Sequence, residues 1–328
     1  MKPLIDSNRP KLVRIIIPIL DDWECAVILC QMLNQAFDSF PEYSVSLIFV
    51  DDGSRSRPDL AEFEVSSLKE VEILCLVGNV GHQRAIALGL SYVQFNRPCD
   101  MLVIMDGDGE DKPEDVPKLL KALESDASSS AVFAERQARL ESVGFRAGYL
   151  MYKILHRILT GLPIRFGNFS ALRFSVLPRL TMMPELWVHY AATALLSRIP
   201  FIALPLDRGT RLGGDSKMRI ETLVYHGLSA ISIYPTLNVR ILAGSFAISL
   251  LLIAVAVISI AIRFTTTLAI PGWTTTVLGL SATLLCLVTF TSFLFIFLNL
   301  RIRNSAVAMP FQVYQAYIEK CETTQITT

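Results

Sequence analysis

The fold of this chain is decided by residues 101–111, which read MLVIMDGDGED. Residues 101–105 are all apolar and predict a buried strand, and four carboxylates follow within six residues. Glycines 107 and 109 let the backbone turn tightly and approach a ligand. Crowded carboxylates repel one another unless they share a cation, and Mg²⁺ or Mn²⁺ suits oxygen ligands. The alternative is a solvated acidic turn that caps a helix beginning near Pro113.

Strands and helices alternate along the first part of the chain. We expect further strands at 14–20, 45–50, 71–77 and 131–134, and helices at 23–37, 83–95 and 113–125. This alternation is typical of an α/β domain with a mostly parallel, Rossmann-like sheet. Ligands of such sheets bind at the carboxyl ends of the strands, where the acidic stretch lies. After Arg136 the pattern changes, with a long helix expected at 145–159 and strands at 169–174 and 201–206.

Two apolar stretches near the C-terminus, 241–262 and 276–300, contain no charged residue. Each is long enough to cross a bilayer, which takes roughly 20 helical residues, although a pair of buried core helices is the alternative. Residues 220–234 are amphipathic and fit a membrane interface. The expected organisation is a catalytic domain at 1–219, a juxtamembrane segment at 220–240, a transmembrane hairpin within 241–300 and a tail at 301–328.

Arginine placement predicts the orientation of this hairpin. Arg240, Arg301 and Arg303 flank its outer ends, whereas Arg263 alone lies in the connecting loop. By the positive-inside rule, both termini and the catalytic domain are expected in the cytosol, attached to the cytoplasmic membrane.

The net charge of zero conceals a segregation of charge. Residues 1–135 carry 12 Lys and Arg against 23 Asp and Glu, whereas residues 136–240 carry 14 against 5. The basic part precedes the membrane segment and could hold phosphates or anionic headgroups; an unspecific surface imbalance is the alternative. The six cysteines and four histidines show no zinc-ligand spacing and imply no disulfide framework. We expect no nucleic-acid partner.

Three expected strand ends carry carboxylates or tight turns: residues 18–22 (PILDD), 50–54 (VDDGS) and 106–111. A glycine turn at 78–82 (GNVGH) and a basic segment at 208–217 complete an ordered set. This set resembles family 2 glycosyltransferases of the GT-A fold, and most closely the polyisoprenyl-phosphate glycosyltransferases such as dolichol-phosphate mannose synthase. The resemblance extends from Ile15 through the paired apolar stretches.

The resemblance implies roles for particular residues. Asp106, Asp108 and Glu110 would bind Mg²⁺ or Mn²⁺, and Asp106, Asp108 and Arg136 would be catalytic. The nucleotide-sugar would be held by Pro18, Leu20, Asp22, Asp51, Asp52, Gly81, His82, Asp106, Arg208 and Lys217. The acceptor phosphate would be held by Arg136, Arg139, Arg146 and Arg211.

Three positions depart from the family pattern. Leu20 replaces an aromatic residue, Glu110 replaces a common Gln, and Asn168 stands where relatives often have Asp. If that Asp is a general base in relatives, Asn168 cannot replace it. A phosphate acceptor is already an anion near neutral pH and needs no strong base, so Asn168 favours a phosphate acceptor. The alternative is that another residue, which the sequence does not identify, serves as the base.

The expected reaction is an inverting transfer of a sugar from a UDP- or GDP-sugar to a polyisoprenyl phosphate, for envelope glycan or glycoconjugate synthesis. The enzyme would also contact membrane lipids, and a homo-oligomer is left open. One alternative is transfer to another lipid or to a polysaccharide. Another is a degenerate subunit that binds nucleotide-sugars without catalysis.

Overall fold

The computed structural model describes residues 9–63, 65–136, 151, 154–161, 166–213, 220–304 and 308–325. The chain forms two compact units. Unit 1 comprises residues 1–146, 165–233 and 308–328, and unit 2 comprises residues 147–164 and 234–307.

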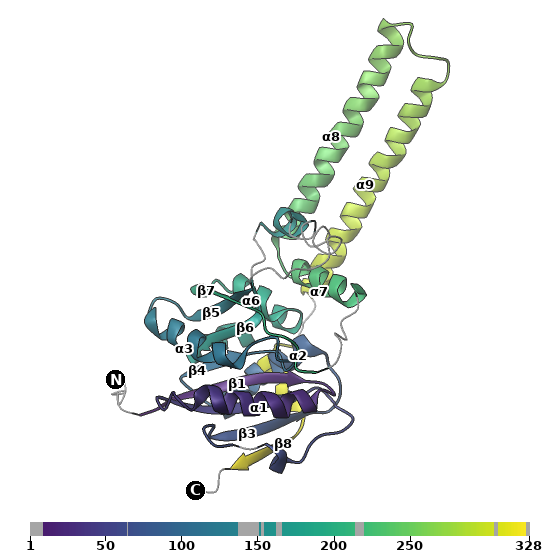
Figure 1. Ribbon diagram of the computed structural model, residues 1–328. Helices are drawn as coiled ribbons and strands as arrows, with labels where there is room; N and C mark the ends of the chain where they lie inside the picture. The colour runs from purple at the N-terminus through teal and green to yellow at the C-terminus, as the bar shows by residue number, and fades with distance from the viewer. Residues whose placement is uncertain are drawn as a thin grey trace, which may run out of the picture. The chain divides into compact units, whose positions relative to one another are not determined.

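Within its described residues, unit 1 contains an eight-stranded sheet with the order β7-β5-β6-β4-β1-β2-β3-β8 (Figure 1). The strands are β1 (Lys11–Ile19), β2 (Tyr43–Asp51), β3 (Glu70–Leu76), β4 (Met101–Ile104), β5 (Ala131–Arg136), β6 (Phe166–Arg173), β7 (Phe201–Leu206) and β8 (Ile318–Gln325). β1 pairs in parallel with β2 and β4, β2 with β3, and β5 with β7, whereas β6 and β8 run antiparallel to their neighbours. The predicted mostly parallel α/β sheet is therefore confirmed.

Helices cover both faces of the sheet. One face packs against α1 (Trp23–Phe37) and α3 (Val116–Ser125), and the other against α2 (His82–Asn96), α5 (Leu177–Thr181), α6 (Tyr190–Leu196) and α10 (Pro310–Tyr317). Successive residues of β1 point to opposite faces: Ile15 and Ile17 belong to the core on the side of α1 and α3, whereas Ile16 belongs to the core on the side of α2. A strand buried on both faces needs a continuous apolar run, which explains the sequence IIIPI at 15–19.

The C-terminal residues complete this sheet. The sequence predicts a C-terminal tail at 301–328, but α10 and β8 belong to unit 1, and β8 pairs antiparallel with β3 from Glu70 to Leu76. The sequence IEKCETTQ of β8 is mostly polar and charged and gives no core-strand signal. An edge strand needs only one paired side, so a polar sequence is compatible with this position.

Unit 2 contains α8 (Thr236–Thr265) and α9 (Trp273–Asn304), which enclose the two predicted spans. Both are long and apolar enough to cross a membrane, and only 6% of the most apolar part of each is buried within the protein. The hydroxyls of Ser245 and Ser292 lie 2.5 Å apart and join the two helices. The described residues 154–160 of the predicted 145–159 helix are helical, and Arg240 donates to the carbonyl oxygen of Arg157 at 3.1 Å.

Unit 1 also contains α7 (Ile220–Ser232), which corresponds to the predicted amphipathic segment. Tyr225 and Leu228 of this helix are exposed. Exposed apolar side chains on a helix that precedes two apolar spans fit the expected interfacial position.

The close packing of α2 on the sheet gives a first prediction. A Cβ atom at Gly89 would lie 2.9 Å from Cγ2 of Ile16 and from Cγ2 of Val50. Both neighbours are β-branched residues in buried strands and cannot move aside. We expect Gly89→Ala to lower the free energy of unfolding by about 1–3 kcal/mol, measured by thermal denaturation of the full chain in detergent.

Gly244→Ala is the matched control, because a Cβ atom there meets no atom within 4 Å. We expect its melting temperature to be no lower than that of the unaltered chain, because alanine favours a helix interior more than glycine does. Equal melting temperatures for both variants would contradict the packing of α2 described above.

Candidate active site

The acidic loop after β4 is held by its own backbone. The backbone amide of Asp106 donates to Oδ2 of Asp111 at 2.9 Å, and that of Glu110 donates to Oδ1 of Asp108 at 3.0 Å. Asp111 is buried, and its Oδ2 serves the loop by accepting this amide. Gly109 has a φ of +81°, a conformation that favours glycine. The loop thereby places Asp106 and Asp108 at the carboxyl end of β4.

A second buried carboxylate organises the neighbouring glycine turn. Asp52 follows β2, and its two oxygens accept the backbone amides of Val80 at 2.7 Å and Gly81 at 2.9 Å. Burial raises the pKa of Asp52, although these two hydrogen bonds and nearby His82 oppose the rise. A Cβ atom at Gly53 would lie 2.7 Å from the Asn79 nitrogen, so only glycine allows the two loops to meet. Asp52 is thus a structural clamp for the turn at 78–81.

His82, the first residue of α2, links this turn to the acidic loop. Its Nε2 lies 3.2 Å from Oδ1 of Asp106 and 3.1 Å from Nδ2 of Asn168. Removal from water opposes protonation, but the hydrogen bond and charge of Asp106, aided by Asp52, raise the pKa of His82. His82 is therefore placed where its ring contacts both the carboxylate of Asp106 and the amide of Asn168.

Asn168 in β6 is the centre of a polar network. Its Nδ2 lies 3.4 Å from Oδ1 of Asp106, and its Oδ1 accepts from Nε2 of Gln83 at 3.4 Å. Gln83 in turn accepts the backbone amide of Tyr190 at 2.6 Å. An amide at 168 can donate to Asp106, whereas a carboxylate there would repel it. The substitution noted in the sequence therefore lies directly beside the acidic loop.

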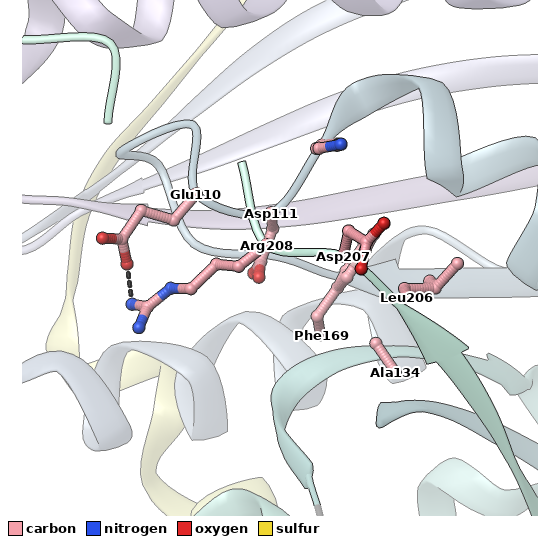
Figure 2. Close-up of a pocket in the computed structure, with 8 residues that line it drawn as sticks. Glu110, Asp111, Ala134, Phe169, Leu206, Asp207 and Arg208 are labelled. Atoms are coloured by element: carbon pink, nitrogen blue, oxygen red, sulfur yellow. Dashed lines mark ion pairs between the residues drawn. The ribbon is translucent and has the colours of Figure 1, made fainter. Parts of the chain in front are cut away.

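The segment that follows β7 folds back onto the acidic loop. The amides of Gly209 and Leu212 donate to the carbonyl oxygens of Glu110 at 2.8 Å and Asp108 at 2.9 Å. Arg208 forms an ion pair with Glu110, and both residues line a small pocket with Asp111, Asp207 and Phe169 (Figure 2). The Nε of Arg208 is buried and has no hydrogen-bond partner among the described residues. It therefore keeps a donor that an anion could accept.

Arg211 bridges two acidic loops. Its guanidinium lies 3.3 Å from Oδ2 of Asp22 and 3.4 Å from Oδ2 of Asp108. The sequence groups Arg211 with the acceptor-binding arginines, whereas the structure places it among the carboxylates expected on the donor side. Its role toward a ligand stays a prediction.

The ends of β1 and β2 are joined by side-chain contacts. The amide of Asp21 donates to the Ser54 hydroxyl at 2.9 Å, and the amide of Arg55 donates to Oδ1 of Asp21 at 2.8 Å. Buried Asp51 accepts the Ser54 amide at 2.9 Å, and its Oδ2 lies 3.3 Å from Nε of Arg57. The exposed Leu20 follows β1 at the same edge of the sheet.

The structure thus brings most predicted donor-site residues to one edge of the sheet. They are Pro18, Leu20, Asp22, Asp51, Asp52, Gly81, His82, Asp106, Asp108, Glu110 and Arg208. Arg139, Arg146 and Lys217 lie outside the described residues, and Arg136 is described only by its backbone at the end of β5. The sequence analysis missed Arg57 and Gln83. Gln83 follows the glycine turn directly, whereas Arg57 lies in a loop with no pattern that predicts its partner.

Two of the three predicted metal ligands suit a divalent cation. Asp106 and Asp108 present partly exposed carboxylates at 26% and 21% of their side-chain surface, whereas Glu110 is paired with Arg208 and only 11% exposed. Within the described ranges, no three His, Cys, Asp or Glu side chains form a cluster that could hold an ion alone. Mg²⁺ commonly binds through one or two carboxylates together with substrate phosphates and water, which this donor set fits.

Comparisons with known proteins show which proteins this chain is similar to. The model of the family described as Glycosyl transferase family 2 matches residues 15–181. The uncharacterized glycosyltransferase YkcC of Bacillus subtilis is 25% identical over 228 residues, which cover 67% of each chain. The undecaprenyl-phosphate 4-deoxy-4-formamido-L-arabinose transferase of Photorhabdus laumondii is 24% identical over 274 residues, 77% of this chain and 78% of that protein. A solved mycobacterial protein shares the fold, with a TM-score of 0.50 at 17% identity over 70% of this chain and 74% of that one.

The clamp at Asp52 gives a prediction for the turn. Asn at this position has one carbonyl acceptor and would direct its amide hydrogens at the second backbone amide. We expect Asp52→Asn to lower the free energy of unfolding by about 1–3 kcal/mol, measured by thermal denaturation in detergent. Glu42→Gln, at an exposed carboxylate, is the control and should leave stability unchanged. Equal stability of both variants would show that Asp52 does not hold the turn.

Proposed function

The chain belongs to glycosyl transferase family 2, and on that premise we propose that it moves a sugar from a UDP- or GDP-sugar to a polyisoprenyl phosphate. One observation carries the proposal: Asp106 and Asp108 lie at the carboxyl end of β4, beside a glycine turn held by Asp52, in a chain with two apolar helices. The undecaprenyl-phosphate transferase that matches 77% of the chain supports this acceptor class.

The donor is proposed to bind across the strand ends. Asp106 and Asp108 would hold the divalent cation, Mg²⁺ or Mn²⁺, and this cation would neutralise the departing nucleoside diphosphate. The unsatisfied Nε of Arg208 and the ammonium of Lys217 would donate to the diphosphate. Asp51 would accept a hydrogen bond from the base, and His82 with Asn168 would hold Asp106 in position.

The acceptor is proposed to attack as an anion. Its phosphate would pair with Arg136 at the end of β5 and with Arg139 and Arg146 in the sequence that follows, since guanidinium binds phosphate through two parallel hydrogen bonds. Attack by phosphate oxygen inverts the anomeric carbon and needs no strong base. This agrees with the neutral Asn168 beside Asp106. The product is a sugar linked to a lipid phosphate.

The sheet supports one feature of the proposed membrane topology. β1 near the N-terminus and β8 near the C-terminus belong to one eight-stranded sheet. A folded sheet lies on one side of a bilayer, so if α8 and α9 cross the membrane they must form a hairpin that returns to the same side. Both termini would then lie with the catalytic residues, and the flanking arginines favour the cytosol.

Replacement of one metal-binding carboxylate tests the proposed reaction. Membranes that contain the enzyme receive radiolabelled sugar nucleotides, Mn²⁺ and undecaprenyl or dolichyl phosphate. We expect Asp108→Asn to reduce lipid-linked label by on the order of a hundredfold or more, because the leaving diphosphate loses its neutralising charge. Glu114→Gln removes one exposed carboxylate from the same part of the chain and should leave the rate unchanged.

Two outcomes would overturn the proposal. Undiminished label in Asp108→Asn would exclude the metal assignment. Labelled product that resists mild acid and migrates unlike a sugar phosphate lipid would exclude the polyisoprenyl-phosphate acceptor and favour another lipid or a polysaccharide.

The pairing of Glu110 with Arg208 yields a separate prediction. If Glu110 serves the ion pair and not the metal, Glu110→Gln should leave the Kd for Mn²⁺ within about twofold of the unaltered protein, whereas Asp108→Asn should raise it at least about tenfold. Calorimetric titration with Mn²⁺ in the presence of UDP or GDP measures both. Equal weakening by both variants would make Glu110 a ligand.

A further inference from the structure

The C-terminal segment 308–325 contacts the strand and helix that flank the glycine turn. β8 pairs with β3 along the whole strand, so β3 would be the edge of the sheet without it. The backbone amide of Val77, the residue just before the turn, donates to the carbonyl oxygen of Tyr317 at 3.0 Å. The segment therefore fixes the point at which the chain leaves β3 and enters the turn.

Glu72 anchors this arrangement in the interior. The residue is fully buried on β3. Its carboxylate accepts hydrogen bonds from the hydroxyl of Tyr92, the thiol of Cys321 and, at 2.9 Å, Nε of Arg97. A buried carboxylate is stable only with such partners. Because Tyr92 belongs to α2 and Cys321 to β8, this one carboxylate ties β3, α2 and the C-terminal strand together.

α10 holds α2 through an aromatic contact. The ring of Tyr314 stacks on Phe95 with centroids 5.7 Å apart and an interplanar angle of 9°, and its hydroxyl accepts from Nδ2 of Asn96 at 3.0 Å. Trp187 donates its indole N–H to the carbonyl oxygen of Ala308 at 2.9 Å and so secures the start of the segment. Tyr314 is only 5% exposed, which makes it the central contact of α10.

We propose that residues 308–325 act as a positioning clamp for residues 77–82, so that the segment after the second apolar helix sets the affinity for the donor. Residues 80 and 81 donate to Asp52, and His82 contacts Asp106, so movement of the turn disturbs both carboxylates. A binding site that is competent for only part of the time binds its ligand more weakly in proportion. The inference rests on the proposed function, because donor binding is its output.

Tyr314→Ala tests the clamp in the full-length protein in detergent. Loss of the ring should release α10 from α2, and we expect amide hydrogen exchange of residues 77–82 to become at least about tenfold faster. The KM for the donor should rise about three- to tenfold while kcat stays within about twofold, because a saturating donor selects the molecules in which the turn is in place. Tyr314→Phe keeps the stacked ring and should restore both values.

Phe37→Ala is the matched control. Phe37 is an equally buried aromatic residue, at the end of α1 on the other face of the sheet. It should lower the melting temperature comparably without faster exchange at 77–82. Unchanged exchange in Tyr314→Ala, or equal acceleration in Phe37→Ala, would overturn the clamp.

Calorimetry with Mn²⁺ and UDP or GDP separates this inference from the proposed function. Binding that weakens in Tyr314→Ala and recovers in Tyr314→Phe supports the clamp. If the unaltered protein binds neither nucleotide, the proposed donor class is wrong, and so is the claim that the segment sets donor affinity. The hydrogen-exchange result still decides whether residues 308–325 hold the turn.

Discussion

Mutual repulsion of the carboxylates after β4 is the constraint on which the rest of unit 1 depends. Asp106, Asp108, Glu110 and Asp111 lie within six residues, and each is compensated differently. Asp106 contacts His82. Asp111 accepts a backbone amide inside the loop, Glu110 pairs with Arg208, and Arg211 bridges Asp108 to Asp22. The compensating arginines come from a segment about a hundred residues later in the chain. The site is therefore assembled by tertiary folding even though its acidic part is contiguous.

Compared with an aspartate at the same position, Asn168 gives this site one negative charge fewer and still forms hydrogen bonds there. The amide donates toward Asp106 and accepts from Gln83, so it joins the acidic loop to the start of α2. An aspartate at the same position would lie 3–4 Å from Asp106 and would repel it unless a cation or proton intervened. The neutral residue thus makes the edge of the sheet less acidic, and it suits an acceptor that brings its own negative charge.

The discontinuous organisation of unit 1 has consequences for how the enzyme is built. Residues 147–164 and 234–307 belong to unit 2, and the chain then returns to unit 1 to supply α10 and β8. The sheet is incomplete until the C-terminal strand has been synthesised, so β3 gains its second neighbour only after both apolar helices have been made. The buried carboxylate of Glu72 accepts a hydrogen bond from the thiol of Cys321 in β8. Pairing of β8 with β3 is therefore specific, because without β8 this carboxylate lacks one of its hydrogen-bond donors.

The sequence by itself determined the strand ends, the turns and the two apolar helices. Each of these is encoded locally: the apolar run 101–105 before the carboxylates, the glycines that allow left-handed turns, and the uncharged stretches long enough to span a bilayer. It also indicated the family through the order of the motifs. Only the tertiary structure decided that Arg211 lies between Asp22 and Asp108, that Gln83 supports Asn168, and that residues 318–325 form a strand. Side-chain partners far apart in the chain leave no periodic signal, and the polar strand β8 exists because β3 offers it an edge to pair with.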